Sequence, residues 1–109
     1  MADLSAEDLK LVTLARSARA RTGAAEGAAV RDGDGRTYAA STVALAALSM
    51  SALQVAVAMA VSSGAPGLEA AAVVSEAGAI DAFGAAAVAE LAPTAAVHLA
   101  RPDGSIVGM

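Results

Sequence analysis

At 109 residues the chain is long enough for one domain with a modest core and too short for two, so we expect residues 1–109 to form a single domain. Apolar residues make up 57% of the chain, but alanine supplies much of this share and buries little area per residue, so we expect association to supplement stability. The net charge of −4 argues against nucleic-acid binding, and the absence of cysteine excludes disulfides and thiolate metal sites.

The first predicted element is a helix that begins after Ser5, a good N-cap residue, with Glu7 and Asp8 at the positive end of the helix dipole. Apolar residues then recur at helical spacing, and Gly23 is expected to end the helix. The residues on this apolar stripe are Leu11, Leu14, Ala15 and Ala18. The arginines of the last turns, Arg16, Arg19 and Arg21, are interpreted as a solvated face in preference to a phosphate site.

A hairpin is expected next, because segments 27–31 and 36–40 flank Asp32-Gly33-Asp34-Gly35, and Asp-Gly is favoured in tight β-turns. The stretch between Arg36 and Glu69 carries no charge and is long enough to cross a bilayer. It is rich in alanine and serine and contains glycine and proline, so we expect a buried helix with flanking strands and no membrane span. The first residues lack the pattern of a signal peptide, and we expect a cytoplasmic location.

The second half of the chain alternates helices with strands. We expect a helix over 50–63, a buried strand over 69–75, a helix from its cap Asp81 to Leu91, and a hairpin of strands 95–99 and 105–107. Helices alternating with strands place helices on both faces of one sheet. The predicted fold is therefore α/β, a three-layer α-β-α sandwich around a mixed five-stranded sheet with hairpins at both ends.

Several segments, taken together with this order, are similar to the nucleoside-type cytidine deaminases. Gly27-Ala28-Ala29-Val30 resembles the first strand of that family, and Asp34-Gly35-Arg36-Thr37-Tyr38 resembles its turn into the second strand. The segment 51–64 resembles the family's second helix, and Glu90-Leu91-Ala92-Pro93 resembles the end of its third. The residues of the second helix that match are Ala52, Ala56, Ala60, Val61, Ser62 and Gly64.

The chain departs from this family at the residues that carry its chemistry. A zinc deaminase uses a Cys or His ligand two residues before a catalytic glutamate, and two further cysteines at the start of the next helix. The resemblance places Ser51 at the position of the first zinc ligand and Leu53 at that of the catalytic glutamate. It places Asp81 and Gly84 at the positions of the two cysteines. A serine is a poor zinc ligand, glycine offers no ligand, and leucine cannot move a proton. The family's ribose-binding segment falls on Thr42-Val43-Ala44.

Other single residues have ordinary structural interpretations. His98, the only histidine, is expected to be structural or exposed because it lies mid-strand without an evident acidic partner. A helix N-cap role accounts for Asp81, and Ser51 is ordinary at a helix start. Glu26 is expected to be solvated or to pair with Arg31 or Arg36.

The sequence therefore favours a catalytically inactive homologue of the cytidine deaminases, without a cofactor, that acts as an oligomeric scaffold or partner-binding protein. The alternative is a sensor that binds a small ligand or nucleoside through Thr42, Ser51 and Asp81, and an active deaminase with an unrecognised metal arrangement is the least favoured. A filled pocket lined by Leu53 and Phe83 would favour the scaffold. We expect a homodimer or homotetramer, in which helix 50–63 with its alanines lies near the interface, and a protein partner as the other possibility.

Overall fold

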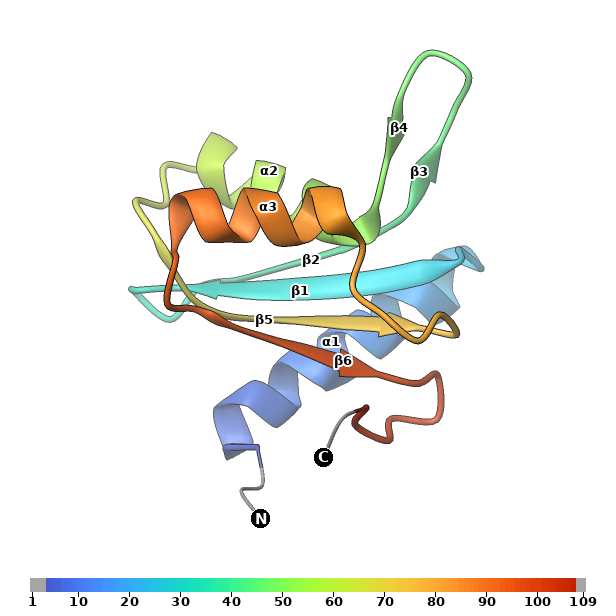
Figure 1. The fold of residues 1–109 in the computed structure, drawn as a ribbon, viewed down its shortest axis with the longest axis horizontal. Coiled ribbons are helices and arrows are strands. Elements are labelled where there is room, and N and C mark those ends of the chain that lie inside the picture. The colour runs from blue at the N-terminus through green and yellow to red at the C-terminus, as the bar shows by residue number, and fades with distance from the viewer. Residues whose placement is uncertain (1–3, 108–109) are drawn as a thin grey trace.

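The computed structural model describes residues 4–107, and the ends of the predicted domain, 1–3 and 108–109, lie outside this range. The described helices and strands follow in the order α1 (Ala6–Thr22), β1 (Glu26–Asp32), β2 (Thr37–Ser41), β3 (Val43–Ala44), β4 (Ser49–Met50), α2 (Ala52–Ser62), β5 (Leu68–Ser75), α3 (Ala82–Leu91) and β6 (Ala96–Ala100). They form three layers, with α1 on one face of the main sheet and α2 and α3 on the other (Figure 1). The predicted three-layer sandwich is confirmed.

The main sheet has the strand order β2-β1-β5-β6. Strand β1 is antiparallel to both of its neighbours, whereas β5 and β6 are parallel and are joined through α3, so the predicted mixed sheet is confirmed. The predicted fifth strand at 105–107 is wrong, because within the described residues only one bridge forms, between Ala100 and Ile106. Asp103 accepts hydrogen bonds from the backbone and hydroxyl of Ser105, which keeps Ser105 in the turn and leaves Ile106 as the residue in register.

Local capping explains the bounds of α1. The Ser5 hydroxyl accepts a hydrogen bond from the backbone N–H of Asp8 at 3.1 Å, and Gly23 adopts a left-handed conformation with φ of 67° at the other end. Both predicted ends are therefore confirmed. The predicted buried stripe included Leu14 but not Val12. In the structure Val12 is buried and Leu14 only partly buried, so the face of α1 that contacts the sheet is rotated by a fraction of a turn from the predicted one.

Small residues let α1 lie very close to the sheet. A Cβ built on Gly27 in β1 would overlap the backbone carbonyl oxygen of Ala15. The core cluster on this face of the sheet contains further buried alanines, including Ala29 and Ala72. The alanine-rich composition therefore permits close packing between layers, and the shortage of large side chains limits the apolar area that each residue buries.

The turn between β1 and β2 is organised by one carboxylate. Asp32 is almost fully buried and accepts hydrogen bonds from the backbone of Asp34 and Arg36 and from the Tyr38 hydroxyl, at 2.9 to 3.0 Å. Burial acts to raise the pKa of Asp32, but the hydrogen bonds from Tyr38 and the two backbone groups outweigh it, and the pKa lies below its ordinary value. The hairpin predicted from the Asp-Gly pairs is confirmed.

A second, smaller hairpin was not predicted. Strands β3 and β4 pair Val43 with Met50 and Ala44 with Ser49, and they project from the body of the molecule (Figure 1). Met50 thus belongs to a strand, and the predicted helix 50–63 begins only after Ser51. We call residues 43–50 the arm. Its two-residue strands are too short to show the alternation by which strands are recognised.

Helix α2 covers the sheet with most of its alanines. Ala52, Ala56 and Ala60 are fully buried in the core, together with Leu53, whereas Ala58 is exposed. Three of the four alanines that were expected near a subunit interface are therefore already covered within the chain. The surface that α2 presents outward is formed by other residues, described below.

Candidate functional site

The amino ends of α2 and α3 meet on one face of the sheet. The two helices lie side by side and run in the same direction (Figure 1), and both begin with a capping residue, Ser51 for α2 and Asp81 for α3. The resemblance had assigned Ser51, Leu53, Asp81 and Gly84 to the positions of the missing zinc site. The structure places all four at these two helix starts.

Leu53 of α2 and Gly84 of α3 lie in close contact. The Leu53 side chain is 0% exposed, and a Cβ built on Gly84 would lie 2.8 Å from the Leu53 Cβ and 2.8 Å from Asp81 Oδ1. Such a distance is too short for two carbons, so a side chain at 84 would require a shift of α2 or α3. The space between the helix starts is therefore filled by leucine.

Asp81 caps α3 with one carboxylate oxygen. Its Oδ2 accepts a hydrogen bond of 2.7 Å from the backbone N–H of Gly84, in agreement with the predicted cap. The other oxygen, Oδ1, is buried and has no hydrogen-bond partner among the described residues. A buried acceptor without a partner is costly, and Asp81 is therefore the one polar group of this site whose bonding capacity is not used.

Ser51 is fully engaged as a cap. Its hydroxyl accepts from the backbone N–H of Gln54 at 3.1 Å, and the Gln54 side-chain oxygen accepts from the backbone N–H of Ser51 at 2.9 Å. This reciprocal pair is a capping box. Gln54 therefore stabilises the start of α2.

Thr42 is occupied elsewhere. Its hydroxyl accepts from the backbone N–H of Glu26 at 3.0 Å, and its own N–H donates to the Glu26 carbonyl at 3.2 Å. Thr42 thus continues the pairing of β1 and β2. Glu26 makes no ion pair with Arg31 or Arg36 among the described residues, so only the solvated alternative for Glu26 agrees with the structure.

These residues do not fit a zinc ion. The hydroxyl of Ser51 is bound to its own helix, Gly84 has no side chain and no room for one, and Leu53 fills the space between them. Residues 4–107 contain no group of three or more His, Cys, Asp or Glu side chains that could hold a metal ion. A zinc site needs three or four such ligands.

The candidate ligand-binding residues do not line the hollows described for this structure. None of four surface hollows found over the described residues is lined by Thr42, Ser51 or Asp81. A filled pocket lined by Leu53 and Phe83 would have favoured the scaffold, but only Leu53 is buried, because Phe83 is 77% exposed. Position 83 lies on the outer side of α3, since the helical turn that buries Gly84 directs its neighbour away from α2.

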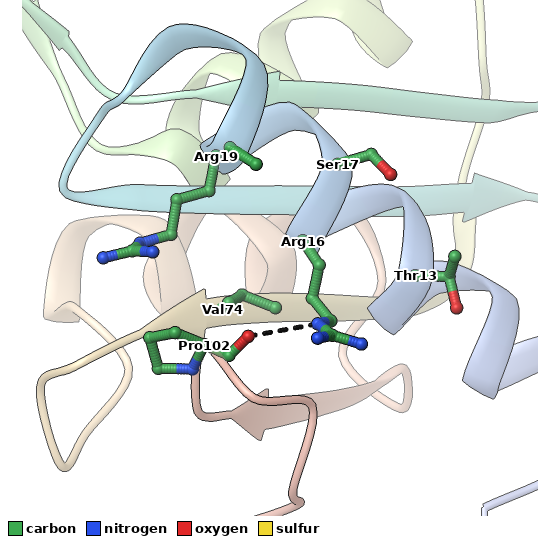
Figure 2. A pocket seen from close by; sticks show the side chains of 7 residues that line it. Thr13, Arg16, Ser17, Arg19, Val74 and Pro102 are labelled. Carbon is green, nitrogen blue, oxygen red and sulfur yellow. Dashed lines mark hydrogen bonds between the residues drawn. The ribbon is translucent and has the colours of Figure 1, made fainter.

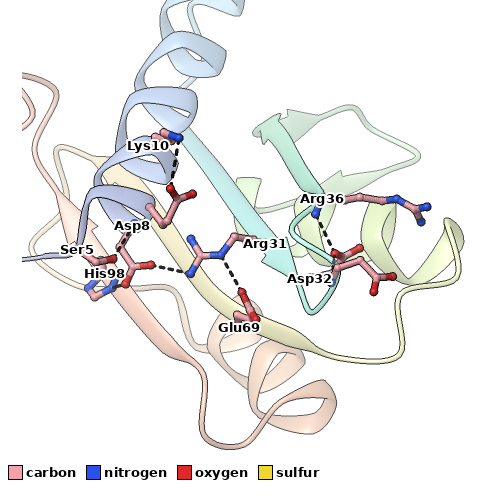
Figure 3. Close-up of polar contacts among 10 residues, drawn as sticks. Ser5, Asp8, Lys10, Arg31, Asp32, Arg36, Glu69 and His98 are labelled. Carbon is pink, nitrogen blue, oxygen red and sulfur yellow. Dashed lines mark hydrogen bonds and ion pairs between the residues drawn. The ribbon is translucent and has the colours of Figure 1, made fainter.

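A charged network on the opposite face was missed by the sequence interpretation. Asp8 of α1 accepts from Arg31 of β1 at 2.9 Å and lies 2.8 Å from Nε2 of His98 in β6, while Arg31 also donates to Glu69 at 3.0 Å (Figure 3). The expectation that His98 has no acidic partner is wrong. Asp8 is 90 positions away in the sequence, so no local pattern could have indicated the pair.

The ionisation of this network follows from its contacts. Burial acts to raise the pKa of Asp8, but hydrogen bonds from Arg31 and His98 outweigh it, and the pKa lies below its ordinary value. Burial likewise acts to lower the pKa of Arg31, which its bonds to Asp8 and Glu69 raise instead. The network joins α1 to three strands of the sheet, and its geometry indicates a structural role.

Comparison with known proteins identifies the family of the chain. A family model described as cytidine deaminase-like matches residues 4–104. A comparison with curated proteins gives no significant match. The family match covers nearly the whole chain and agrees with the three-layer fold and with the residues that carry the resemblance. The chain therefore belongs to the cytidine deaminase-like family, as a degenerate member that lacks the zinc ligands and the catalytic glutamate.

Proposed function

We propose that this protein is a catalytically inactive member of its family that acts as an oligomeric scaffold. The observation that carries the first part is the fully buried Leu53 between the starts of α2 and α3. Hydrolytic deamination in this family needs a metal-activated water and a carboxylate that moves protons. Leucine supplies neither, and its buried side chain lies against Gly84 between the two helix starts.

Elemental analysis and an activity assay test this part directly. The purified protein, incubated with zinc and then dialysed, is expected to retain less than stoichiometric metal. Ammonia release from cytidine and deoxycytidine is expected to equal that of the buffer. One tightly held zinc per chain, or turnover that rises with protein concentration, would overturn the proposal.

The proposed scaffold role rests on an uncharged, apolar surface formed by the arm and α2. Leu45 is 63% exposed and Leu48 50% exposed on the arm, and Met59 is exposed on α2. A hollow of about 390 Å³ lies where the arm joins the helix, lined by Met50, Val55, Ala58, Met59, Ser62 and Ser63. Exposed apolar side chains that gather in this way are typical of an interaction surface.

A second copy of the chain is the occupant we propose for this surface. Two copies that each carry a net charge of −4 repel one another. The arm and α2 lie between Arg36 and Glu69, where the chain has no charge, so contact through this surface would bring no like charges together. The arm and the hollow lie next to each other, so a twofold axis would let the arm of each copy cover the hollow of the other. Such reciprocal contacts are the rule in twofold dimers, and a stable one buries more than about 1,000 Å².

Light scattering over a range of concentrations tests the dimer, with variants that place a charge on the surface. Leu48→Arg and Met59→Arg are expected to shift the protein to monomers, because each would bury an unpaired charge in the interface. Leu9→Arg is the matched control, since Leu9 is 47% exposed on α1, on the other face of the sheet, and should not alter the mass. A wild-type monomer at all concentrations would contradict the dimer and favour a different protein partner.

One observation supports the alternative role of a small-ligand or nucleoside sensor. The buried Oδ1 of Asp81 has no partner, and a ligand with a hydrogen-bond donor would satisfy it. Calorimetric titration with cytidine tests this role. Saturable binding that Asp81→Ala abolishes would favour the sensor, whereas the absence of heat with cytidine would remove it.

A further inference from the structure

The face of the sheet that carries α1 contains a hollow of about 280 Å³. It lies between the second half of α1, the end of β5 and the turn after β6. Figure 2 shows Arg16 beside Val74 and bonded to Pro102, while the Arg19 side chain extends from α1 away from the Arg16 guanidinium. The starts of α2 and α3 lie on the opposite face. This hollow is therefore separate from the site discussed above.

Both arginines are held in place by the protein. Arg16 donates from Nε to the Pro102 carbonyl at 3.1 Å, and Arg19 donates from Nε to the Ala25 carbonyl at 3.2 Å. A bond through Nε fixes the guanidinium plane and leaves the terminal nitrogens free to bind another group. Because these side chains are already held in place, ligand binding costs little of their conformational entropy.

The terminal nitrogens of these arginines are weakly engaged. Within residues 4–107, those of Arg16 donate no hydrogen bond to the protein, and the only acid near those of Arg19 is Glu76, at 3.9 Å. The Glu76 side chain is largely exposed, so this long pair contributes little. The nearby Asp103 is already bonded to Ser105 through one oxygen. The lining of the hollow therefore carries two guanidinium groups, and the carboxylates of Glu76 and Asp103 lie near them.

We infer that this hollow binds the phosphate group of a small ligand. Guanidinium groups bind phosphate oxygens through paired, charge-assisted hydrogen bonds, and the hydroxyl of Ser17 in the lining adds a further donor. Val74 and Pro102 offer apolar contact to an organic part attached to the phosphate. The volume suits one phosphate with a small substituent. Arg16 is exposed and Arg19 partly buried, which agrees with the predicted solvated face, and the inference adds a phosphate ligand to that face.

Titration of the full chain with inorganic phosphate and with ribose 5-phosphate tests the inference, with sodium chloride at equal ionic strength as the reference. Amide NMR shifts at Ser17 and Gly104 are expected to change saturably with phosphate. Tighter binding of ribose 5-phosphate would identify an organic phosphate as the ligand, whereas equal binding would identify free phosphate. Shifts no larger than those caused by chloride would overturn the inference.

Charge variants show whether binding is local. Arg16→Gln and Arg19→Gln are each expected to weaken binding at least about tenfold, since each removes one charged donor pair. Arg36→Gln is the matched control, because Arg36 is exposed in the turn after β1 and makes no ion pair among the described residues. Equal weakening in all three would show non-specific attraction and contradict a site. If a variant unfolds, the amide shifts of the wild-type chain still decide the question.

Discussion

Replacement of Leu53 by glutamate restores the residue type that the family uses to move protons. In this chain the position is buried, and the described residues around it include no set of metal ligands. Leu53 is fully buried, so Leu53→Glu removes an apolar contribution of about 2–3 kcal/mol. The new carboxylate would also lie among apolar side chains and near Asp81, which is costly for a charge. We expect the free energy of unfolding to fall by at least about 3 kcal/mol at pH 7.

The size of the domain converts this loss into a temperature. One kcal/mol corresponds to roughly 4–8 °C in a domain of about 100 residues, so the melting temperature should fall by at least about 12 °C. The introduced carboxyl should have a folded-state pKa above its unfolded value of about 4.3. The folded protein then binds more protons than the unfolded one, and the deficit is greatest above the folded pKa and shrinks as the pH falls toward 4.

Thermal unfolding followed by circular dichroism at pH 7 and pH 5 measures both effects. Leu53→Gln is the matched control, because it has a similar shape and no charge, and its loss should not depend on pH. Deamination of cytidine should stay at the buffer level in Leu53→Glu, since the positions of the metal ligands remain Ser51, Asp81 and Gly84. An unchanged melting temperature would refute the reasoning, because it would mean that Leu53 faces water or an open polar pocket.

Two further changes test the packing of α1. Gly27→Ala should cost about 1–3 kcal/mol or more, because the new Cβ would overlap the Ala15 carbonyl, whereas Gly33→Ala, with no atom nearby, should shift the denaturant midpoint little. Asp8→Asn should cost about 1–3 kcal/mol at pH 7, and the exposed Glu7→Gln almost nothing. Because the folded pKa of Asp8 is lowered from 3.8, its stabilisation is present above that pH and lost as the pH falls through the folded pKa. The variant's stability should therefore depend less on pH in this acid range, and an equal dependence would contradict the assignment.

The resemblance located the candidate site well because its residues lie at helix starts, which local signals mark. It assigned Leu53, Asp81 and Gly84 to one place, and the structure brings these three into contact. It could not show that leucine fills the space, since burial depends on the relative position of two helices. The outward direction of Phe83 escaped it for the same reason.

The sequence by itself determined those features whose causes are local. Ser5, Gly23 and Asp81 end or begin helices through bonds to residues three or four positions away, and the Asp-Gly pairs turn the chain between β1 and β2. Only the tertiary structure decided the order of the strands in the main sheet and the projection of the arm from it. It also decided that Asp8 contacts His98. These features depend on segments far apart in the chain, whose contact is set by packing across the sheet.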